Sequence, residues 1–115
     1  MTEREARNKA QSLKRELGPG WTTHVWDGTF GYHYELISED GYIHVSKSGG
    51  KKNPIYFVYI SDTWGKCYIA WSGKKSTYAE ALRSAVNDMS KDIIQMNKTA
   101  KALTNILKKV KREKI

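Results

Sequence analysis

The 115-residue sequence contains one cysteine, two prolines and no long apolar run. With Cys67 alone, no disulfide can form within the chain, so a reducing, cytoplasmic setting is expected. The longest apolar stretch, PIYFVYI, is far shorter than the ~20 residues that a membrane helix needs, so we expect no membrane contact. After Ser76 there is neither glycine nor proline, which removes the usual helix breakers from the last third of the chain.

Positive charge is unevenly distributed along the chain. The net charge is +8, and residues 98–115 hold seven cations against the single anion Glu113. Residues 18–97 carry eight cations and eight anions. We therefore divide the chain into a body, 1–97, and a basic extension, 98–115. This division favours a polyanionic partner such as nucleic acid or a nucleoprotein, with a lysine-rich, solvated helix end as the alternative.

The pattern predicts an α+β fold. Apolar residues at helical spacing indicate a helix from 2 to 17, which Gly18-Pro19-Gly20 ends. Asp27-Gly28 and Asp40-Gly41 have the composition of two-residue hairpin turns. Five segments rich in Trp, Tyr, Val and Ile predict strands at 21–26, 30–37, 42–47, 55–60 and 66–71. Their short connections favour a five-stranded antiparallel meander.

A long C-terminal helix is predicted from 77 to 113. Thr77 and Glu80 have capping-box spacing at its start. Its apolar residues alternate steps of four and three, which is a heptad seam: Leu82, Val86, Met89, Ile93, Met96, Ala100, Leu103, Leu107 and Val110. The helix would be about 55 Å long, whereas a six-residue strand spans about 20 Å, so roughly half of it must overhang the sheet.

The overhanging part of the seam needs a partner. The first helix, a fold-back near Asn97, and a second chain are the three candidates. We expect a homo-oligomer, because further apolar residues widen the stripe beyond a two-helix seam. The predicted oligomer contact consists of Ile93, Met96, Leu103, Leu107 and Val110.

The hairpin register divides the strand residues between two faces. The predicted core face holds Trp21, Thr23, Val25, Phe30, Tyr32, Tyr34, Leu36, Ile43 and Val45. All three histidines and Glu35 fall on the other face, where Trp26, His33, Tyr42 and His44 are candidates for stacking on bases. A polar, partly solvated outer face is the simplest interpretation. Histidines with a carboxylate also suit a transition metal, but we expect no metal and no cofactor.

Two lysine-rich segments, YIHVSKSGGKK and YIAWSGKKS, follow strands three and five. In a meander these segments lie at one edge of the sheet, next to the N-terminus of the long helix, where free N–H groups favour phosphate. The predicted phosphate-binding residues are Lys47, Lys51, Lys52, Lys74 and Lys75, joined by Lys108, Lys109, Lys111 and Arg112 of the tail. Ordinary solvated loops are the alternative. Trp64, at the tip of the last hairpin, is a candidate for protein contact.

No catalytic motif is present, and we expect no enzyme activity. The chain has no Gly-x-Ser-x-Gly elbow, and neither GGKKN nor SGKKST has the upstream glycine of a phosphate loop. Cys67 is expected to point into the core, away from the histidines.

The layout LGPGW…GYHYELI…GYIHV…W…STYAEALRSAV resembles small uncharacterised bacteriophage proteins with a helix, an aromatic meander and a Thr-x-x-Glu-Ala-Leu helix start. The resemblance covers residues 13–90 and implies a phage or prophage protein acting in the host cytoplasm, where inhibitors of host defences, including anti-CRISPR proteins, are frequent. GKKSTYAEALRSAV is similar to a double-stranded-RNA-binding domain, in which Lys74 and Lys75 would grip phosphates. TYAEALRSAV is similar to HicB-type antitoxins. We expect non-enzymatic binding of nucleic acid or a nucleoprotein, with a host-defence inhibitor acting by protein contact as the alternative.

Overall fold

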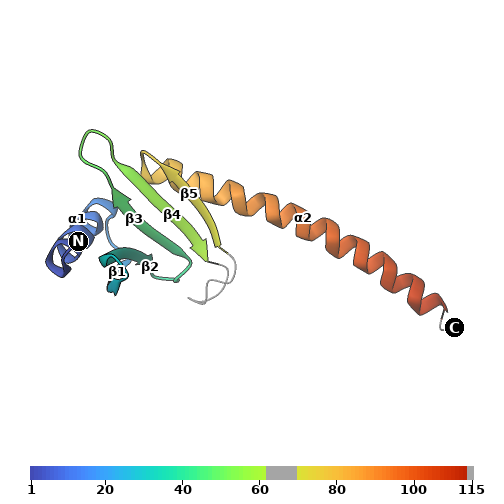
Figure 1. Cartoon of the computed structure of the whole chain (residues 1–115). Coiled ribbons are helices and arrows are strands. Elements are labelled where there is room, and N and C mark those ends of the chain that lie inside the picture. The colour runs from blue at the N-terminus through green and yellow to red at the C-terminus, as the bar shows by residue number, and fades with distance from the viewer. Residues whose placement is uncertain (62–69, 114–115) are drawn as a thin grey trace.

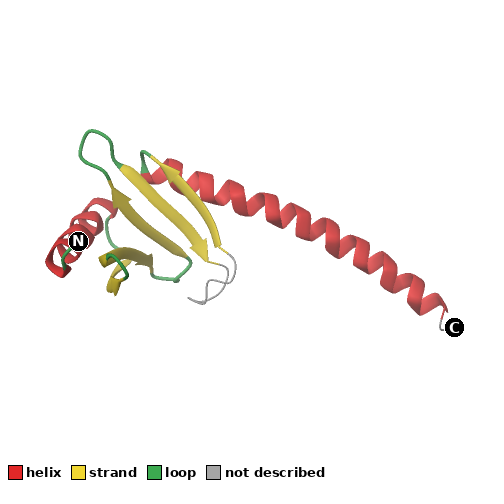
Figure 2. Cartoon of the chain, viewed as in Figure 1, coloured by secondary structure: helices red, strands yellow, loops and turns green. Residues whose placement is uncertain are grey.

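The computed structural model describes residues 1–61 and 70–113 and confirms the α+β fold (Figures 1 and 2). The sheet is antiparallel with strand order β1-β2-β3-β4-β5, which is the predicted meander. Helix α1 packs on β1 and β2, and α2 packs on β4 and β5, so that both helices lie on the same face. The elements are α1 (Glu3–Leu17), β1 (Trp21–Gly28), β2 (Gly31–Ser38), β3 (Ile43–Ser48), β4 (Ile55–Ser61), β5 (Ala70–Lys75) and α2 (Tyr78–Glu113).

Helix α1 begins and ends as the sequence predicts. The Glu5 backbone N–H donates to Thr2 Oγ1 at 3.2 Å, which caps the first turn. Gly18 ends the helix at a positive φ of 94°, and its N–H donates to the Lys14 carbonyl. Between these ends, Ala6, Ala10 and Leu13 are buried against the sheet. Spacing and caps together therefore determine this element locally.

The predicted core face forms the core. Leu36 pairs with Val45, as the Asp40-Gly41 turn predicts, and both side chains are fully buried. Asp40 fixes that turn, because its Oδ1 accepts from Ser38 Oγ at 2.6 Å and from the Tyr42 N–H at 3.0 Å. Val58 of β4, which pairs with Val45, completes this layer.

The first hairpin turn lies two residues beyond the predicted position. Gly28 pairs with Gly31, so Thr29-Phe30 forms the loop in place of Asp27-Gly28. The ring of His33 packs close over Gly28, since a Cβ there would lie 2.4 Å from it. A shift of the turn by two residues leaves each strand residue on its predicted face. Phe30 is the exception, since it lies at the turn tip and is 89% exposed rather than in the core.

The last strand also differs from the prediction of 66–71, because β5 covers Ala70–Lys75 and includes the SGKK segment that composition assigns to a turn. Gly73 explains the difference. A Cβ at Gly73 would lie 2.0 Å from the Ala81 carbonyl oxygen and 2.9 Å from the Ala85 nitrogen, so α2 can approach β5 only at a glycine. The predicted strand residues 66–69, including Cys67, lie outside the described residues.

Helix α2 begins at the predicted capping residue, with the Glu80 N–H donating to Thr77 Oγ1 at 3.2 Å. Ala81, Ala85 and Met89 pack on the sheet, and Trp71 Nε1 donates to Asp92 Oδ2 at 2.6 Å where the helix leaves it. Residues 93–113, called the overhang below, continue as helix without a fold-back at Asn97 (Figure 1). They extend the molecule to 68 × 27 × 27 Å. No helix in the described part of the chain is long and apolar enough to cross a membrane.

Candidate nucleic-acid interface

The β3–β4 loop and the end of β5 lie at the same edge of the sheet, as the meander predicts (Figure 1). Lys51 and Lys52 are exposed in the loop, and Lys74 and Lys75 are exposed at the end of the strand. These four lysines are called the basic edge below. Among residues 1–61 and 70–113, none of the four takes part in an ion pair. Their charge is therefore available to a ligand.

The sequence predicts that Lys74 and Lys75 lie in a loop after the last strand, but the structure places both within β5. Because they are neighbours in a strand, their side chains face opposite sides of the sheet. Lys74 Nζ lies 5.4 Å from the centre of the Phe57 ring on the face without helices. Lys75 shares its face with Gly73 and lies beside α2. The strand thus holds both cations at defined positions, and the edge carries positive charge on both of its sides.

Lys47 is also predicted to belong to this group, but the structure pairs it with α1. Its Nζ lies 3.1 Å from Glu16 Oε2 and 5.0 Å from the Tyr56 ring centre, and the Tyr56 hydroxyl donates to Glu16 Oε1. Burial acts to raise the Glu16 pKa, but the hydrogen bonds from Tyr56 and Lys47 outweigh it and lower the pKa. The hydrogen bonds with Tyr56 and Glu16 raise the pKa of Lys47. Lys47 is neutralised by Glu16 and fastens α1 to the sheet.

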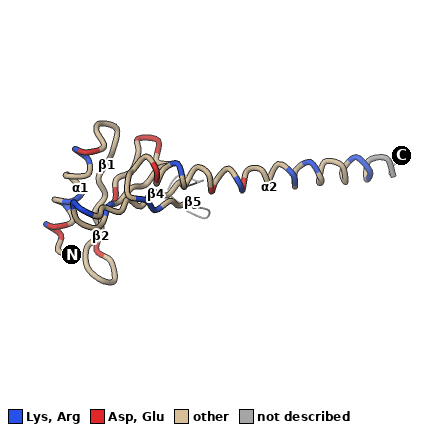
Figure 3. Tube along the Cα trace, turned by 90° about the horizontal axis from the view of Figure 1, so that it is seen from above, with Lys and Arg blue, Asp and Glu red and all other residues tan. Residues whose placement is uncertain are grey.

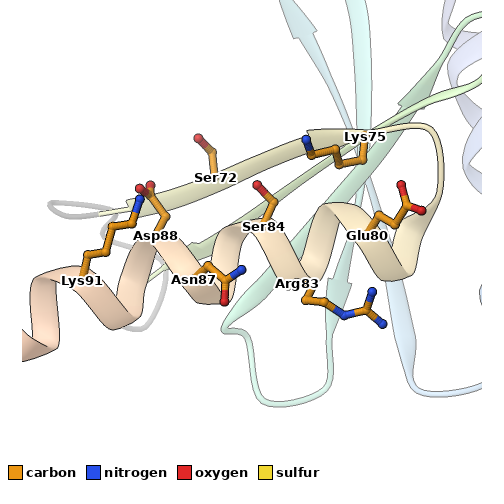
Figure 4. A pocket seen from close by; sticks show the side chains of 8 residues that line it. All are labelled: Ser72, Lys75, Glu80, Arg83, Ser84, Asn87, Asp88 and Lys91. Carbon is orange, nitrogen blue, oxygen red and sulfur yellow. The ribbon is translucent and has the colours of Figure 1, made fainter.

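A groove of about 590 Å³ runs between the outer edge of β5 and the first turns of α2 (Figure 4). Its lining includes three cations, Lys75, Arg83 and Lys91, and two anions, Glu80 and Asp88, together with Ser72, Ser84 and Asn87. The cations on the helix follow each other at a spacing of eight residues, which places them about 12 Å apart along one flank. The groove therefore extends from the basic edge along the helix, and its lining carries both cations and anions. Sequence reasoning missed it, although the Arg83-x₃-Asn87-x₃-Lys91 spacing marks one helical flank.

Cations recur along the overhang (Figure 3). Lys98, Lys101, Lys108 and Lys109 are exposed, and at 100° per residue they lie on the side of the helix opposite the seam. Lys111 and Arg112 extend the same helix toward its end. These six cations of the overhang are called the basic stripe below. They lie about 30 Å or more from the basic edge along α2, so the two groups cannot form one compact site.

On the helix-free face, three rings form a stack. The Trp26 ring lies 4.9 Å from the His24 ring and 5.6 Å from the His33 ring, at interplanar angles of 24° and 26°. All three residues are exposed, and Trp26 is 38% exposed. The predicted candidates Trp26 and His33 thus lie side by side. Tyr42, which is also 38% exposed, is on the same face near the β2–β3 turn.

His44, the fourth predicted stacking candidate, is buried and cannot stack on a base. Its ring lies 4.5 Å from the Tyr59 ring, nearly parallel to it, and its Nδ1 lies 3.2 Å from Glu35 Oε1. Glu35 also accepts from the Tyr59 hydroxyl and lies 3.5 Å from His24 Nδ1. The Glu35 carboxylate therefore links side chains of the four strands β1 to β4. This cluster of His24, Glu35, His44 and Tyr59 has a structural role. In residues 1–61 and 70–113, no group of three or more His, Cys, Asp and Glu could hold a metal ion.

Trp64, the predicted protein-contact residue, lies outside the described residues. The seam residues Ile93, Met96, Leu103, Leu107 and Val110 are all exposed in the single chain.

Comparisons of the chain with protein-family models, with curated proteins and with solved structures gave no match. The similarity to phage proteins, to double-stranded-RNA-binding domains and to HicB-type antitoxins stays a prediction from the sequence.

Proposed function

We propose that this chain is a non-enzymatic protein that binds nucleic acid or a nucleoprotein through the basic edge and the basic stripe of α2. The observation that carries this proposal is the set of four lysines at one end of the sheet that form no ion pair with any residue the structure describes, two of them held on β5. Cations of this kind bind phosphates by displacing counterions, and they do so without reading bases. The groove cations Arg83 and Lys91 extend the path of a bound strand along α2.

The exposed stack of His24, Trp26 and His33 supports a preference for single strands. Bases can stack on an exposed aromatic surface only when they are not already stacked in a duplex. Lys74 lies over Phe57 on the same side of the sheet, so that a cation and stacking rings share one surface. The proposal includes an origin in a phage and action in the host cytoplasm, as the resemblance of the sequence to small phage proteins implies.

The test is a salt titration of binding to mixed-sequence DNA and RNA. The variant Lys74→Ala with Lys75→Ala removes two phosphate contacts, so the slope of log affinity against log salt should flatten by about two, uniformly across sequences. The matched control is Arg4→Ala with Lys9→Ala, which removes two exposed cations from α1 and should leave the slope unchanged. Failure of the wild-type protein to bind either nucleic acid at low salt contradicts the proposal.

A second candidate function is inhibition of a host-defence protein, of the anti-CRISPR type, by protein contact. The observation that favours it is the mixed charge of the β5–α2 groove beside a sheet edge. β5 is the last strand in the sheet, and an edge strand can accept an extended peptide through its backbone groups. Glu80 and Asp88 would repel phosphate but would pair with cations of a peptide. Complex formation that persists at high salt and after nuclease treatment would distinguish this candidate from the first.

A further inference from the structure

The overhang exposes an apolar surface that the rest of the chain does not cover. Ile93, Met96, Leu103, Leu107 and Val110 are between 42% and 64% exposed. Helix α1 packs on β1, β2 and the nearby part of β3, and α2 does not fold back on itself. Of the three candidates for covering the seam, the first helix and a fold-back are therefore excluded within the described residues. A second chain is the candidate that is left.

The exposed seam continues the face that packs on the sheet. Met89 packs against the core, and Ile93 follows it by one helical turn on the same side of α2. The sheet contacts this side of the helix as far as Asp92, where Trp71 makes its hydrogen bond, and it leaves the seam residue Val86 37% exposed. The body and the missing partner must therefore lie on one side of the helix, one after the other along its axis.

This placement decides the direction of the partner helix. In a parallel, in-register pair, residues 78–92 of the second copy would occupy the space where β4 and β5 already lie, and the two bodies would meet at the same end. In an antiparallel pair, each body covers the first half of its own helix and the partner covers the second half. The overhang is 21 residues long, and it would end where the body of the second copy begins.

Side-chain sizes match in the antiparallel arrangement. With the two-fold axis between residues 101 and 102, Ile93 faces Val110 of the second copy, and Met96 faces Leu107. Ala100, the smallest seam residue, then faces the larger Leu103 in both copies. A parallel pair would instead stack Ala100 on itself and leave a void, which weakens a helix interface.

Charge favours the same arrangement. The overhang carries six cations and one anion, whereas residues 78–92 carry two cations and three anions. A parallel pair would place two strongly basic ends side by side. An antiparallel pair separates them and brings each basic end to the acidic first half of the other helix, near Asp88 and Asp92.

We propose that a second copy of this chain covers the seam, with the two overhangs packed antiparallel around Ala100 and Leu103. The two basic edges then lie at opposite ends of the dimer, about 70 Å apart at 1.5 Å per residue. A dimer of this shape offers two separated phosphate sites to one polyanion, and binding at both raises the overall affinity. The dimer itself does not depend on nucleic-acid binding.

Disulfide trapping tests the arrangement. In a Cys67→Ser background, Ile93→Cys and Val110→Cys proteins are oxidised separately and after mixing in equal amounts. The antiparallel dimer predicts cross-linking only in the mixture, because the two thiols introduced at position 93 of one dimer would be about 25 Å apart, far beyond disulfide reach. Lys98→Cys mixed with Asn105→Cys is the matched control. These two positions also lie at the same level along the antiparallel pair, but their side chains point away from the seam, so they should not cross-link.

Light scattering on the wild-type chain supplies a measurement that needs no variant. We expect twice the 13.2 kDa of one chain, and a single-chain mass for Leu103→Lys with Leu107→Lys. Cross-linking of each cysteine protein by itself would show a parallel pair and overturn the proposal. A wild-type protein that is monomeric at high concentration and gives no cross-link in any mixture would overturn it as well. Neither result would bear on phosphate binding by the basic edge.

Discussion

Residues 78–92 and 93–113 of α2 share one apolar spacing but lie in opposite surroundings. In the first half, Ala81, Ala85 and Met89 pack on the sheet, and small residues allow the helix to approach Gly73 closely. In the second half, the apolar residues are larger and exposed, and the opposite side of the helix carries the basic stripe. The helix–sheet contact therefore depends on two small residues beside the seam, Ala81 and Ala85, whereas in the second half the large seam residues themselves are left for a partner.

The largest difference is expected between the core and the overhang. Leu36→Ala removes a fully buried side chain and should lower the free energy of unfolding by about 4 kcal/mol. Leu103→Ala, at a position 59% exposed in the single chain, should change it by less than about 0.5 kcal/mol when the protein is dilute enough to be monomeric. Urea unfolding followed by Trp fluorescence measures both. A similar loss for the two variants would show that the overhang belongs to the core.

The next effect concerns the first half of α2 alone. Gly73→Ala places a Cβ against the backbone of Ala81, which cannot move without displacing the helix, so we expect a loss of about 3 kcal/mol. Gly50→Ala is the control, because a Cβ at Gly50 meets nothing within 4 Å. Thermal melts of both variants give the comparison. Equal stability of the two would mean that α2 does not approach β5 as closely as described.

A smaller effect is expected at the junction between the two halves. Asp92→Ala removes the acceptor for Trp71 Nε1 and should cost about 1 kcal/mol. Asp88→Ala, one turn earlier in the groove, removes the same charge but no such hydrogen bond and should cost less. Hydrogen exchange of the amides around residue 92 should rise in the first variant only. Unchanged exchange would place the end of the sheet contact elsewhere.

The smallest effect is a pH dependence of α1 docking. The Glu16 pKa is lowered from its ordinary 4.5, so the contribution of Glu16 to stability is present above that value and is lost as the pH falls through the lowered pKa. Because Lys47 and Glu16 are partly exposed, the contribution is at most about 1 kcal/mol. The difference in melting temperature between wild type and Glu16→Gln should shrink below about pH 4. A constant difference for Glu16→Gln over this range would refute the assignment.

Most of the fold could be predicted because its signals are local. Thr2 and Gly18 delimit α1, Asp40-Gly41 fixes the second hairpin, and Thr77 starts α2, each through contacts within a few residues. The faces of the sheet were predicted despite the misplaced first turn, since a shift by two residues preserves the alternation of side chains. The candidate site was predicted only in part. Lys51, Lys52, Lys74 and Lys75 do lie at one edge, because strand direction in a meander decides it.

Periodicity and turn chemistry act over short distances along the chain, so they are enough to set the order of elements, the two faces and the heptad seam. The roles that depend on distant partners follow from the folded arrangement. Gly73 belongs to a strand because α2 passes over it, Lys47 is neutralised because Glu16 of α1 lies beside it, and His44 is buried beneath Tyr59 and bonded to Glu35. A glycine, a lysine and a histidine can each occupy several environments with little difference in local free energy. Their environment is chosen by residues far away in the sequence, and so it becomes fixed only when the chain has folded.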